Sequence, residues 1–254
     1  AKILGDNGYR TALIGKWHLG YLQKHHPMNF GFQKFVGFKS GNVDYQSHRN
    51  RYGDVDWWDG LEMKNMPGYT TTLLTTLSED YIKENKDKPF CLYIAHAAPH
   101  SPMQGPNEKA IRTEATLEGD KNSDRPNKEI YKDMVEELDW SVGRILETLK
   151  KYKLDKNTFV VFFSDNGPVI NNGGSTGGYR GAKGAPWEGG HRVPGICYMP
   201  GTVKGGTMCK QTVMSFDLFP TMLDMANIHY DDSKKKLDGA SLVPLFKGKE
   251  LSQR

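Results

Sequence analysis

The chain has 254 residues and a formal net charge of +4, with 37% hydrophobic and 25% charged residues. These values are typical of one soluble domain that buries a core, and they exclude a disordered or fibrous protein. Positive residues are scattered apart from the lysines at 234–236, which we expect in a solvated turn, and no apolar segment is long enough to span a bilayer, so neither nucleic-acid binding nor a membrane span is indicated.

The first quarter of the chain predicts a helix end, a strand and a long loop. Residues 1–6 are typical of the tail of a helix closed by Asn7-Gly8, and we expect any signal peptide to lie upstream of them. A strand is predicted over residues 11–14. Residues 30–66 are rich in Gly, Asp, Asn and aromatic residues without a sustained period, which predicts a long functional loop or small hairpin that shapes substrate access.

Two helices and two strands are predicted next. Residues 70–84 have leucines on one side and hydroxyls at the start for capping, and residues 127–154 follow the three-or-four spacing of an amphipathic helix. The apolar runs at 90–95 and 158–163 are typical of strands buried on both faces.

The remaining residues predict a glycine-rich loop at 173–190, a strand near 193–198 and a helix at 218–226 preceded by Asp217. Apolar strands that alternate with helices favour crossover connections and a mostly parallel sheet. The three cysteines are irregularly spaced, which argues against a disulfide framework or a zinc cluster and favours small buried residues at Cys91, Cys197 and Cys209.

Chemically active side chains follow three of the predicted strands. In open α/β sheets ligands bind beyond the carboxyl ends of the strands, where Lys16 and His18, His100, and Asp165-Asn166 stand. Residues i and i+2 of a strand share a side, so the lysine and histidine at 16 and 18 can meet one phosphate or sulfate ester.

Each of these signals also has an ordinary interpretation. His100 stands between prolines and could be a rigid turn residue, and Asp-Asn-Gly is a common turn signal. Carboxylate and amide oxygens such as those of Asp165 and Asn166 nevertheless suit calcium or magnesium rather than zinc.

Several motifs together carry a family resemblance. The run Gly-Tyr-Arg-Thr-Ala-x-x-Gly-Lys-Trp-His-Leu-Gly from Gly8 to Gly20 closely resembles the second signature of the sulfatase family, the formylglycine-dependent members of the alkaline-phosphatase-like superfamily. Further segments similar to that family are residues 99–102, 163–167, 181–194, 217–221 and 238–242.

The resemblance covers nearly the whole chain and implies an alkaline-phosphatase-like α/β fold, with a mostly parallel central sheet flanked by helices and truncated at both ends. We therefore expect residues 1–254 to be part of a sulfatase catalytic domain, without the segment that carries the nucleophile and without the smaller C-terminal subdomain.

The activity that the family implies is hydrolysis of a sulfate ester by a formylglycine hydrate, with a divalent cation that is usually calcium. None of the three cysteines begins a Cys-x-Pro-x-Arg pattern, so the nucleophile is expected upstream of this chain, together with the family's paired aspartates. By residue-for-residue match, Asp165 and Asn166 are metal ligands, with magnesium as the alternative ion. The 254 residues alone are expected to show little turnover.

The resemblance also assigns roles to the other site residues. Lys16 and Lys183 neutralise charge on the sulfate oxygens, His100 protonates the leaving alcohol, and His18 removes a proton from the covalent sulfate hemiacetal so that sulfate leaves. His48 is a further candidate for substrate binding. The remaining pair in the glycine-rich block, Glu188 and Arg192, is expected to be a structural ion pair.

The substrate is expected to be a sulfated carbohydrate or an aryl sulfate, and the location periplasmic, secreted or lysosomal, by family resemblance only. Two other functions stay open. One is a phosphodiesterase or phosphonate hydrolase of the same superfamily, because lysines and histidines also suit phosphate. The other is a noncatalytic carbohydrate-binding module, suggested by the missing nucleophile and the aromatic residues Trp57 and Trp58.

Overall fold

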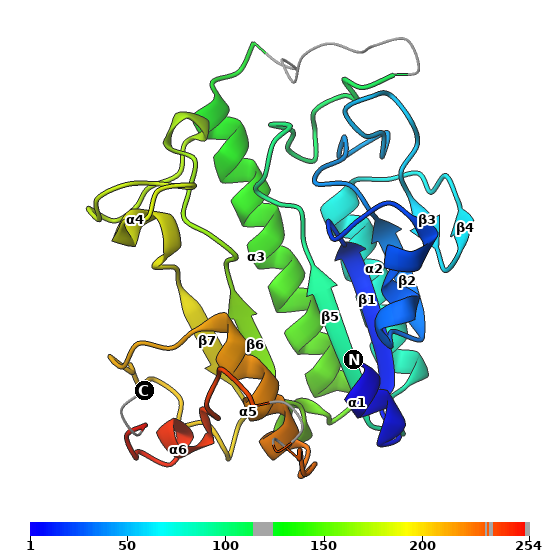
Figure 1. The fold of residues 1–254 in the computed structure, drawn as a ribbon. Coiled ribbons are helices and arrows are strands. Elements are labelled where there is room, and N and C mark those ends of the chain that lie inside the picture. The colour runs from blue at the N-terminus through cyan, green and yellow to red at the C-terminus, as the bar shows by residue number, and fades with distance from the viewer. Residues whose placement is uncertain (114–123, 232, 234–235, 252–254) are drawn as a thin grey trace. The chain divides into compact units, whose positions relative to one another are not determined.

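The computed structural model describes residues 1–113, 124–231, 233 and 236–251 (Figure 1). Its chain divides into two compact units. The first comprises Ala1–Tyr152 and Ser164–Val193, and the second comprises Lys153–Phe163 and Pro194–Arg254. Lys234 and Lys235 of the predicted solvated turn lie outside the described residues.

The first unit is built on a five-stranded sheet with the order β4-β3-β2-β1-β5. Strands β1 (Arg10–Lys16), β2 (Lys34–Phe38) and β5 (Phe90–Ala95) are parallel, whereas β3 (Trp58–Asp59) and β4 (Glu62–Met63) pair antiparallel at one side. The expected α/β sheet is therefore present, but it is mixed rather than mostly parallel.

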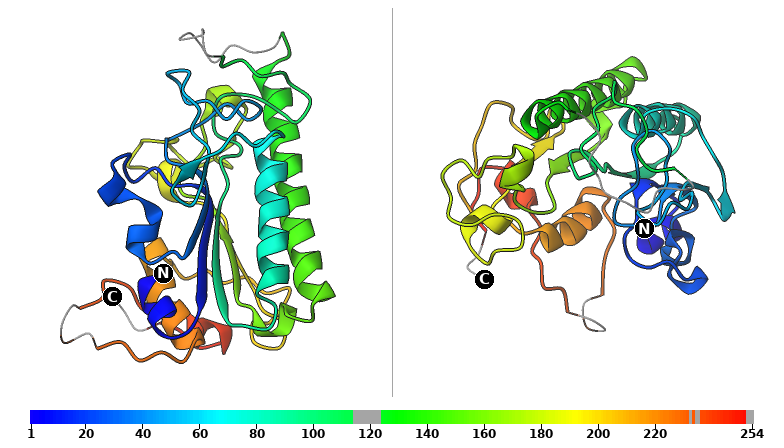
Figure 2. Two further views of the ribbon diagram at one scale, coloured as in Figure 1. Left: turned by 90° about the vertical axis from the view of Figure 1, so that its right-hand side faces the viewer. Right: turned by 90° about the horizontal axis from the view of Figure 1, so that it is seen from above.

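Helices cover this sheet where the apolar spacing predicted them. Helix α2 spans Thr70–Glu84 and α3 spans Asn127–Lys151, and the two lie side by side on one face of the sheet (Figure 2). The short α1 (Lys2–Asp6) ends at Asn7 as expected. The predicted hydroxyl cap of α2 is wrong, because Tyr69 is the N-cap residue and the Thr70 hydroxyl donates to the Tyr45 carbonyl (3.0 Å) instead.

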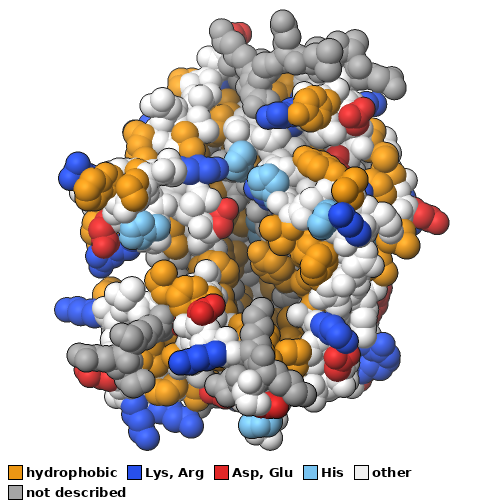
Figure 3. Space-filling model, viewed as in Figure 1, with side chains coloured by type: hydrophobic (Ala, Val, Ile, Leu, Met, Phe, Trp, Pro, Cys, Tyr) orange, Lys and Arg blue, Asp and Glu red, His pale blue; other side chains and the backbone are white. Residues whose placement is uncertain are grey.

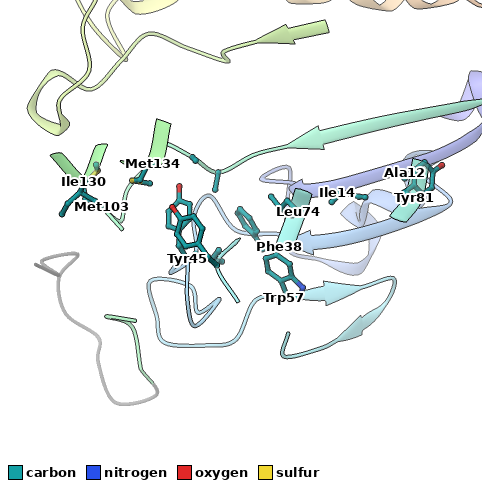
Figure 4. Packing of buried hydrophobic residues seen from close by; sticks show 14 residues of the cluster. Ala12, Ile14, Phe38, Tyr45, Trp57, Leu74, Tyr81, Met103, Ile130 and Met134 are labelled. Atoms are coloured by element: carbon teal, nitrogen blue, oxygen red, sulfur yellow. The ribbon is translucent and has the colours of Figure 1, made fainter. Parts of the chain in front are cut away.

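The core of the first unit lies between β1 and the two long helices. Leu13 and its neighbours in β1 are buried on both faces, because strands flank β1 on either side and helices cover it. Figure 4 shows the packing of the buried cluster, whose members include Ala12, Ile14, Phe38, Tyr45, Trp57, Leu74, Tyr81, Met103, Ile130 and Met134.

Two strand predictions need correction. Strand β5 was expected to be buried on both faces, but it stands at the end of the strand order and its Tyr93 side chain is 49% exposed. The predicted loop at 30–66 contains β2, a full partner of β1, in addition to the small hairpin of β3 and β4. The five residues of β2 include Gly37, and a segment that short shows no clear period.

The second unit contains an antiparallel pair of strands, β6 (Val160–Phe163) and β7 (Gly195–Tyr198), and the helices α5 (Leu218–Met225) and α6 (Val243–Phe246). Asp217 precedes α5 as predicted; its carboxylate is buried and accepts the backbone N–H groups of Met214 (2.7 Å) and Ala240 (3.0 Å). It thereby ties two connecting segments to the start of the helix.

Short helices and cysteines complete the description. The 3-10 helices are Gln23–His25, Pro27–Phe30, Asp155–Asn157, Ile170–Asn172 and Ser215–Asp217, and α4 spans Glu188–His191. The three cysteines are free, as expected, but none is fully buried: Cys91 and Cys197 are half-buried and Cys209 is exposed, so the prediction of a buried residue is wrong at Cys209. Within the described ranges, no helix combines the length and apolarity that crossing a membrane requires.

Two buried carboxylates hold the loop between β2 and β3. Asp44 accepts hydrogen bonds from the backbone N–H groups of Gln46, Ser47, Ile111 and Arg112, at 2.8 to 2.9 Å. Burial alone would raise the pKa of Asp44, but these four amides lower it below the ordinary value. Asp56 likewise accepts from the two backbone N–H groups that follow β2 (2.8 and 3.1 Å).

The three parallel strands approach one another closely near their carboxyl ends. Gly15 of β1 is in register with Gly37 of β2 on one side and with Ala95 of β5 on the other. Both glycines have positive φ (122° and 148°). A Cβ atom at Gly15 would collide with the Ala95 carbonyl, and one at Gly37 would collide with the carbonyl of Gly15. These positions therefore require glycine.

We expect Gly15→Ala to lower the free energy of unfolding by more than about 3 kcal/mol, because it combines a disfavoured φ with a backbone collision. Gly8→Ala is the matched control: Gly8 has a φ of 86° but open space around it, so its loss should stay near 1 kcal/mol. Denaturant unfolding measures both. Equal losses at the two positions would contradict the close approach of the strands.

Candidate active site

Lys16 and His18 lie where β1 leaves the sheet. The strand ends at Lys16, and the chain continues beside β2, with the N–H groups of Trp17 and His18 donating to the carbonyls of Phe38 (2.9 Å) and Lys39 (3.2 Å). His18 has a left-handed backbone (φ 55°). The expected alternation of strand side chains therefore does not apply to His18, because the residue follows the end of the strand and has a left-handed backbone.

The His18 ring packs on a glycine. A Cβ atom at Gly41 would lie 2.6 Å from His18 Nε2, so only glycine leaves room for the imidazole in this position. Trp17, between the two site residues, is fixed separately: its indole N–H donates to the His25 carbonyl (2.7 Å) and its ring contacts Phe30.

His100 follows β5 and is oriented by its own loop. Its Nδ1 lies 2.8 Å from the Ser101 carbonyl oxygen, which can only accept, so Nδ1 carries the hydrogen and the neutral ring has its free lone pair on Nε2. The hydroxyl of the buried Tyr45 donates to the His100 carbonyl (2.9 Å). Backbone and ring are thus both fixed.

Asp165, Asn166 and Lys183 stand on two loops that are joined by backbone hydrogen bonds. The Gly167 N–H donates to the Gly190 carbonyl (2.8 Å), and the Lys183 N–H donates to the Pro168 carbonyl (3.0 Å). No side chain fits at Gly167, because a Cβ atom there would collide with the Gly189 carbonyl. Backbone contacts therefore hold the two loops against each other within the first unit.

Five of the predicted site residues lie close enough for their charges to interact: Lys16, His18, His100, Asp165 and Lys183. Burial lowers the pKa of Lys16, with Asp165 raising it and Lys183 lowering it. Burial also lowers the pKa of His18, and the charges of Lys16 and Lys183 lower it further while Asp165 raises it. All these residues belong to the first unit.

The same charges act on His100. Its pKa is lowered mainly by burial, is raised by the bond to Ser101, and is lowered again by Lys183 and Lys16. His18 and His100 are therefore neutral near pH 7 and stand in a field of two lysines that one carboxylate only partly offsets. Figure 3 shows a face of the molecule on which histidine side chains lie near lysine or arginine side chains.

Such a site suits an anion. A bound anion would offset the lysine charges and so raise the pKa of both histidines, which couples anion binding to proton uptake. Asp165 and Asn166 supply hard oxygen donors that fit calcium or magnesium. Among the described residues, however, no three His, Cys, Asp or Glu side chains form a group that could hold a metal ion.

His48 has to be removed from the candidate set. It is fully buried, with its ring 4.3 Å from that of Trp57, and burial lowers the pKa of His48 to about 4. Trp57 is itself fully buried, and Lys39 Nζ lies 3.5 Å from the centre of the Trp58 ring. Neither a substrate contact at His48 nor an open aromatic platform at these tryptophans is available.

Other predictions in the glycine-rich block hold. Arg192 donates to Glu188 (3.0 Å), which is the expected structural ion pair. Sequence reasoning missed the supporting role of Gly41 and of the Ser101 carbonyl. A backbone carbonyl has no side-chain signal, and Gly41 carries none until His18 is placed in space.

Comparisons with known proteins point to one family. A family model described as Sulfatase matches residues 1–228. N-acetylgalactosamine-6-sulfatase of Canis lupus familiaris is 32% identical over 270 residues, covering 100% of this chain and 49% of that protein. Arylsulfatase J of Mus musculus is 33% identical over 245 residues, covering 93% of this chain and 40% of that protein.

A solved structure agrees with these relatives. Ps i-CgsB, in complex with k-i-k-neocarrahexaose, is 29% identical with a TM-score of 0.84, covering 98% of this chain and 57% of that one. The chain spans about half the length of the curated relatives it matches.

The charge coupling can be measured without any activity. In metal-free buffer, Lys183→Met should raise the pKa of His18 and His100, because a repelling charge is lost, whereas Asp165→Asn should lower the pKa of both. NMR titration of the imidazole resonances reports each ring. Lys150→Met, at an exposed position of α3, is the control and should change neither pKa. Responses of the same sign in the two site variants would refute the common site.

Proposed function

The chain belongs to the sulfatase family, and from that premise we propose that it is the part of a sulfuric ester hydrolase that holds the sulfate group and the leaving alcohol. Its fold is the alkaline-phosphatase-like α/β fold of its structural neighbours. The single observation that carries the proposal is that the charges of Lys16, Asp165 and Lys183 act together on His18 and His100.

Lys16 and Lys183 are proposed to bind the sulfate oxygens. Lys16 is half-buried, and burial lowers its pKa because the ammonium loses contact with water. An anion bound beside the ammonium compensates for this lost hydration. Fixed cations that face oxygens on which negative charge builds up stabilise the transition state more than the ground state. The lysines therefore serve both binding and catalysis.

His100 is proposed to be the general acid. Because its Nδ1 already donates to Ser101, proton uptake takes place at Nε2. The pKa of His100 is lowered in the empty site by burial and then by the two lysines, and the negative charge of a bound sulfate ester reverses the lysine contribution. The ring thus gains its proton when substrate binds, and can pass it to the leaving oxygen.

His18 is proposed to accept a proton on the other side of the sulfate. Burial and both lysines lower the pKa of His18 in the empty site, where the ring is neutral, and a bound anion raises that pKa, which makes the ring a stronger proton acceptor. In the complete protein a formylglycine hydrate would supply the attacking oxygen and a divalent cation, calcium in preference to magnesium, would polarise it. Asp165 and Asn166 would hold that cation together with ligands from outside this chain.

A sulfated carbohydrate is the favoured substrate. One relative is named for a sulfated N-acetylgalactosamine, and the solved structure described above contains a neocarrahexaose. An aryl sulfate is the second candidate, because Arylsulfatase J is also similar. By family resemblance we place the protein in the periplasm, the lysosome or the extracellular space.

Both other functions lose support. The family match favours sulfate over phosphate as the transferred group. Burial of Trp57 and coverage of Trp58 by Lys39 remove the aromatic platform that suggested a noncatalytic module.

In the full-length protein, Lys183→Met should lower kcat for sulfate release about a hundredfold, because one preplaced charge is lost.

His100→Gln should slow hydrolysis of an alkyl sulfate far more than hydrolysis of a nitrophenyl sulfate, since only the poor leaving group needs protonation. Lys150→Met is the control. Equal slowing of both esters would reduce His100 to a positioning residue, and faster release of phosphate than of sulfate from matched esters would overturn the assignment.

The 254-residue chain should bind a sulfate ester and show no turnover above background, because it has no Cys-x-Pro-x-Arg nucleophile segment. Calorimetry measures binding, and ion chromatography measures released sulfate. Sustained sulfate release by this chain would show that the reaction uses a different nucleophile.

A further inference from the structure

Three exposed side chains form a patch beside His18. Tyr21 and Tyr52 are each 58% exposed, the Arg51 guanidinium lies 5.0 Å from the centre of the Tyr52 ring, and the charge of Arg51 acts on the Tyr21 hydroxyl. The pKa of Tyr21 is raised by partial burial and by the charges of Asp56 and Tyr52, while Arg51 and the Gly41 backbone lower it. Gly41 is the residue on which the His18 ring packs, so the patch adjoins the candidate active site.

Tyr21 is held in place by a buried cation. Lys39 is only 7% exposed, and its Nζ donates to the Tyr21 carbonyl (3.3 Å) while lying over the Trp58 ring. The indole N–H of Trp58 donates to Asp56 (2.8 Å). The packed side chains of Lys39, Trp58 and Asp56 therefore hold the Tyr21 backbone in place without a ligand.

Arg51 and Tyr52 stand at the tip of a well-defined turn. The side-chain oxygen Oδ1 of Asn50 accepts hydrogen bonds from the backbone N–H groups of Tyr52 (2.8 Å) and Asp54 (3.2 Å). The backbone N–H of Asn50 donates to the Asp54 carbonyl (2.8 Å). This Asx turn fixes the backbone that carries both side chains.

The guanidinium of Arg51 has unused donors. It donates one hydrogen bond, from Nη2 to the Tyr52 hydroxyl (2.8 Å), and within the described part of the chain it pairs with no carboxylate. A guanidinium offers five N–H donors in a planar fork that matches a carboxylate or a sulfate. Its free donors and its contact with the exposed Tyr52 ring favour an anionic ligand with a flat apolar face.

We propose that Tyr21, Arg51 and Tyr52 form a subsite for the sugar unit next to the one whose sulfate is removed, and that this neighbouring unit carries an anionic group bound by Arg51. The tyrosine rings contact the C–H face of the sugar and their hydroxyls its polar rim, while Arg51 binds a carboxylate or a second sulfate. This proposal rests on the sulfatase function and narrows its substrate to an acidic, at least disaccharide-sized glycan.

The test measures binding of four saccharides to the 254-residue chain by calorimetry. One is a monosaccharide sulfate, and three are disaccharides sulfated on the same unit, whose neighbouring unit is neutral, carboxylated or sulfated. At least one anionic disaccharide should bind about tenfold more tightly than the neutral one, as expected for charge-assisted hydrogen bonds to Arg51. The arm that shows the gain identifies carboxylate or sulfate as the recognised group.

Arg51→Gln should remove this tenfold preference and leave binding of the monosaccharide unchanged. The matched control is Arg10→Gln, an exposed arginine at the opposite end of β1 from Lys16, which should keep the preference. Tyr21→Ala should weaken all three disaccharides together. Thermal unfolding of each variant confirms that these exposed positions leave the fold intact.

The outcomes separate the two proposals. Anionic disaccharides that bind no better than the neutral one, or a preference that survives Arg51→Gln, overturn the subsite and leave the sulfatase function standing. Monosaccharide binding that does not weaken in Lys183→Met overturns the proposed function of the sulfate site itself. An Arg51-dependent preference that persists in Lys183→Met would locate glycan recognition in the patch independently of the sulfate site.

Discussion

The close approach of three parallel strands at Gly37, Gly15 and Ala95 is the constraint on which the rest of the structure depends. These residues share one level of the sheet, and the collisions that side chains would cause mean that the strands keep this spacing only with glycine at the first two positions. Lys16 follows Gly15 directly, and the loop to His100 begins after Ala95. The spacing of the strands therefore determines the positions of Lys16 and of the loop to His100, independently of any contact between their side chains.

The site combines groups that are costly to bring together. Two lysines, two histidines and one carboxylate interact in a region where Lys16 and His100 are half-buried and the other three residues are exposed. Burial is the first cause of the lowered pKa of Lys16, His18 and His100. Like charges held this way destabilise the folded chain, and an anion relieves the repulsion. Affinity for a negatively charged ligand and protonation of the histidines consequently have the same cause, the excess of positive charge at the site. A change in one therefore predicts a change in the other.

The sequence predicted those elements of the fold in which apolar residues recur at a regular spacing or form a continuous run. Helices α2 and α3 keep a leucine- and isoleucine-rich face over several turns, and β1 is a plain apolar run. Strand β2 was missed because its pairing with β1 is a long-range interaction and its five residues include a glycine. The family motifs predicted the site residues but not three structural details: the left-handed backbone at His18, the ring orientation that Ser101 gives to His100, and the burial of His48 against Trp57.

Asp44 and Asp56 hold their loop through backbone N–H groups, which every amino acid except proline provides. The exposed side chains between these two anchors, Arg51 and Tyr52 among them, are therefore free to diverge while the path of the loop is kept, whereas the buried Tyr45 and His48 are fixed by the core. Substitutions at these exposed positions can therefore change what the surface binds without disturbing the strands that the loop connects. For the same reason an engineer could vary the tip of the loop alone, and the buried residues near its ends would keep their packing.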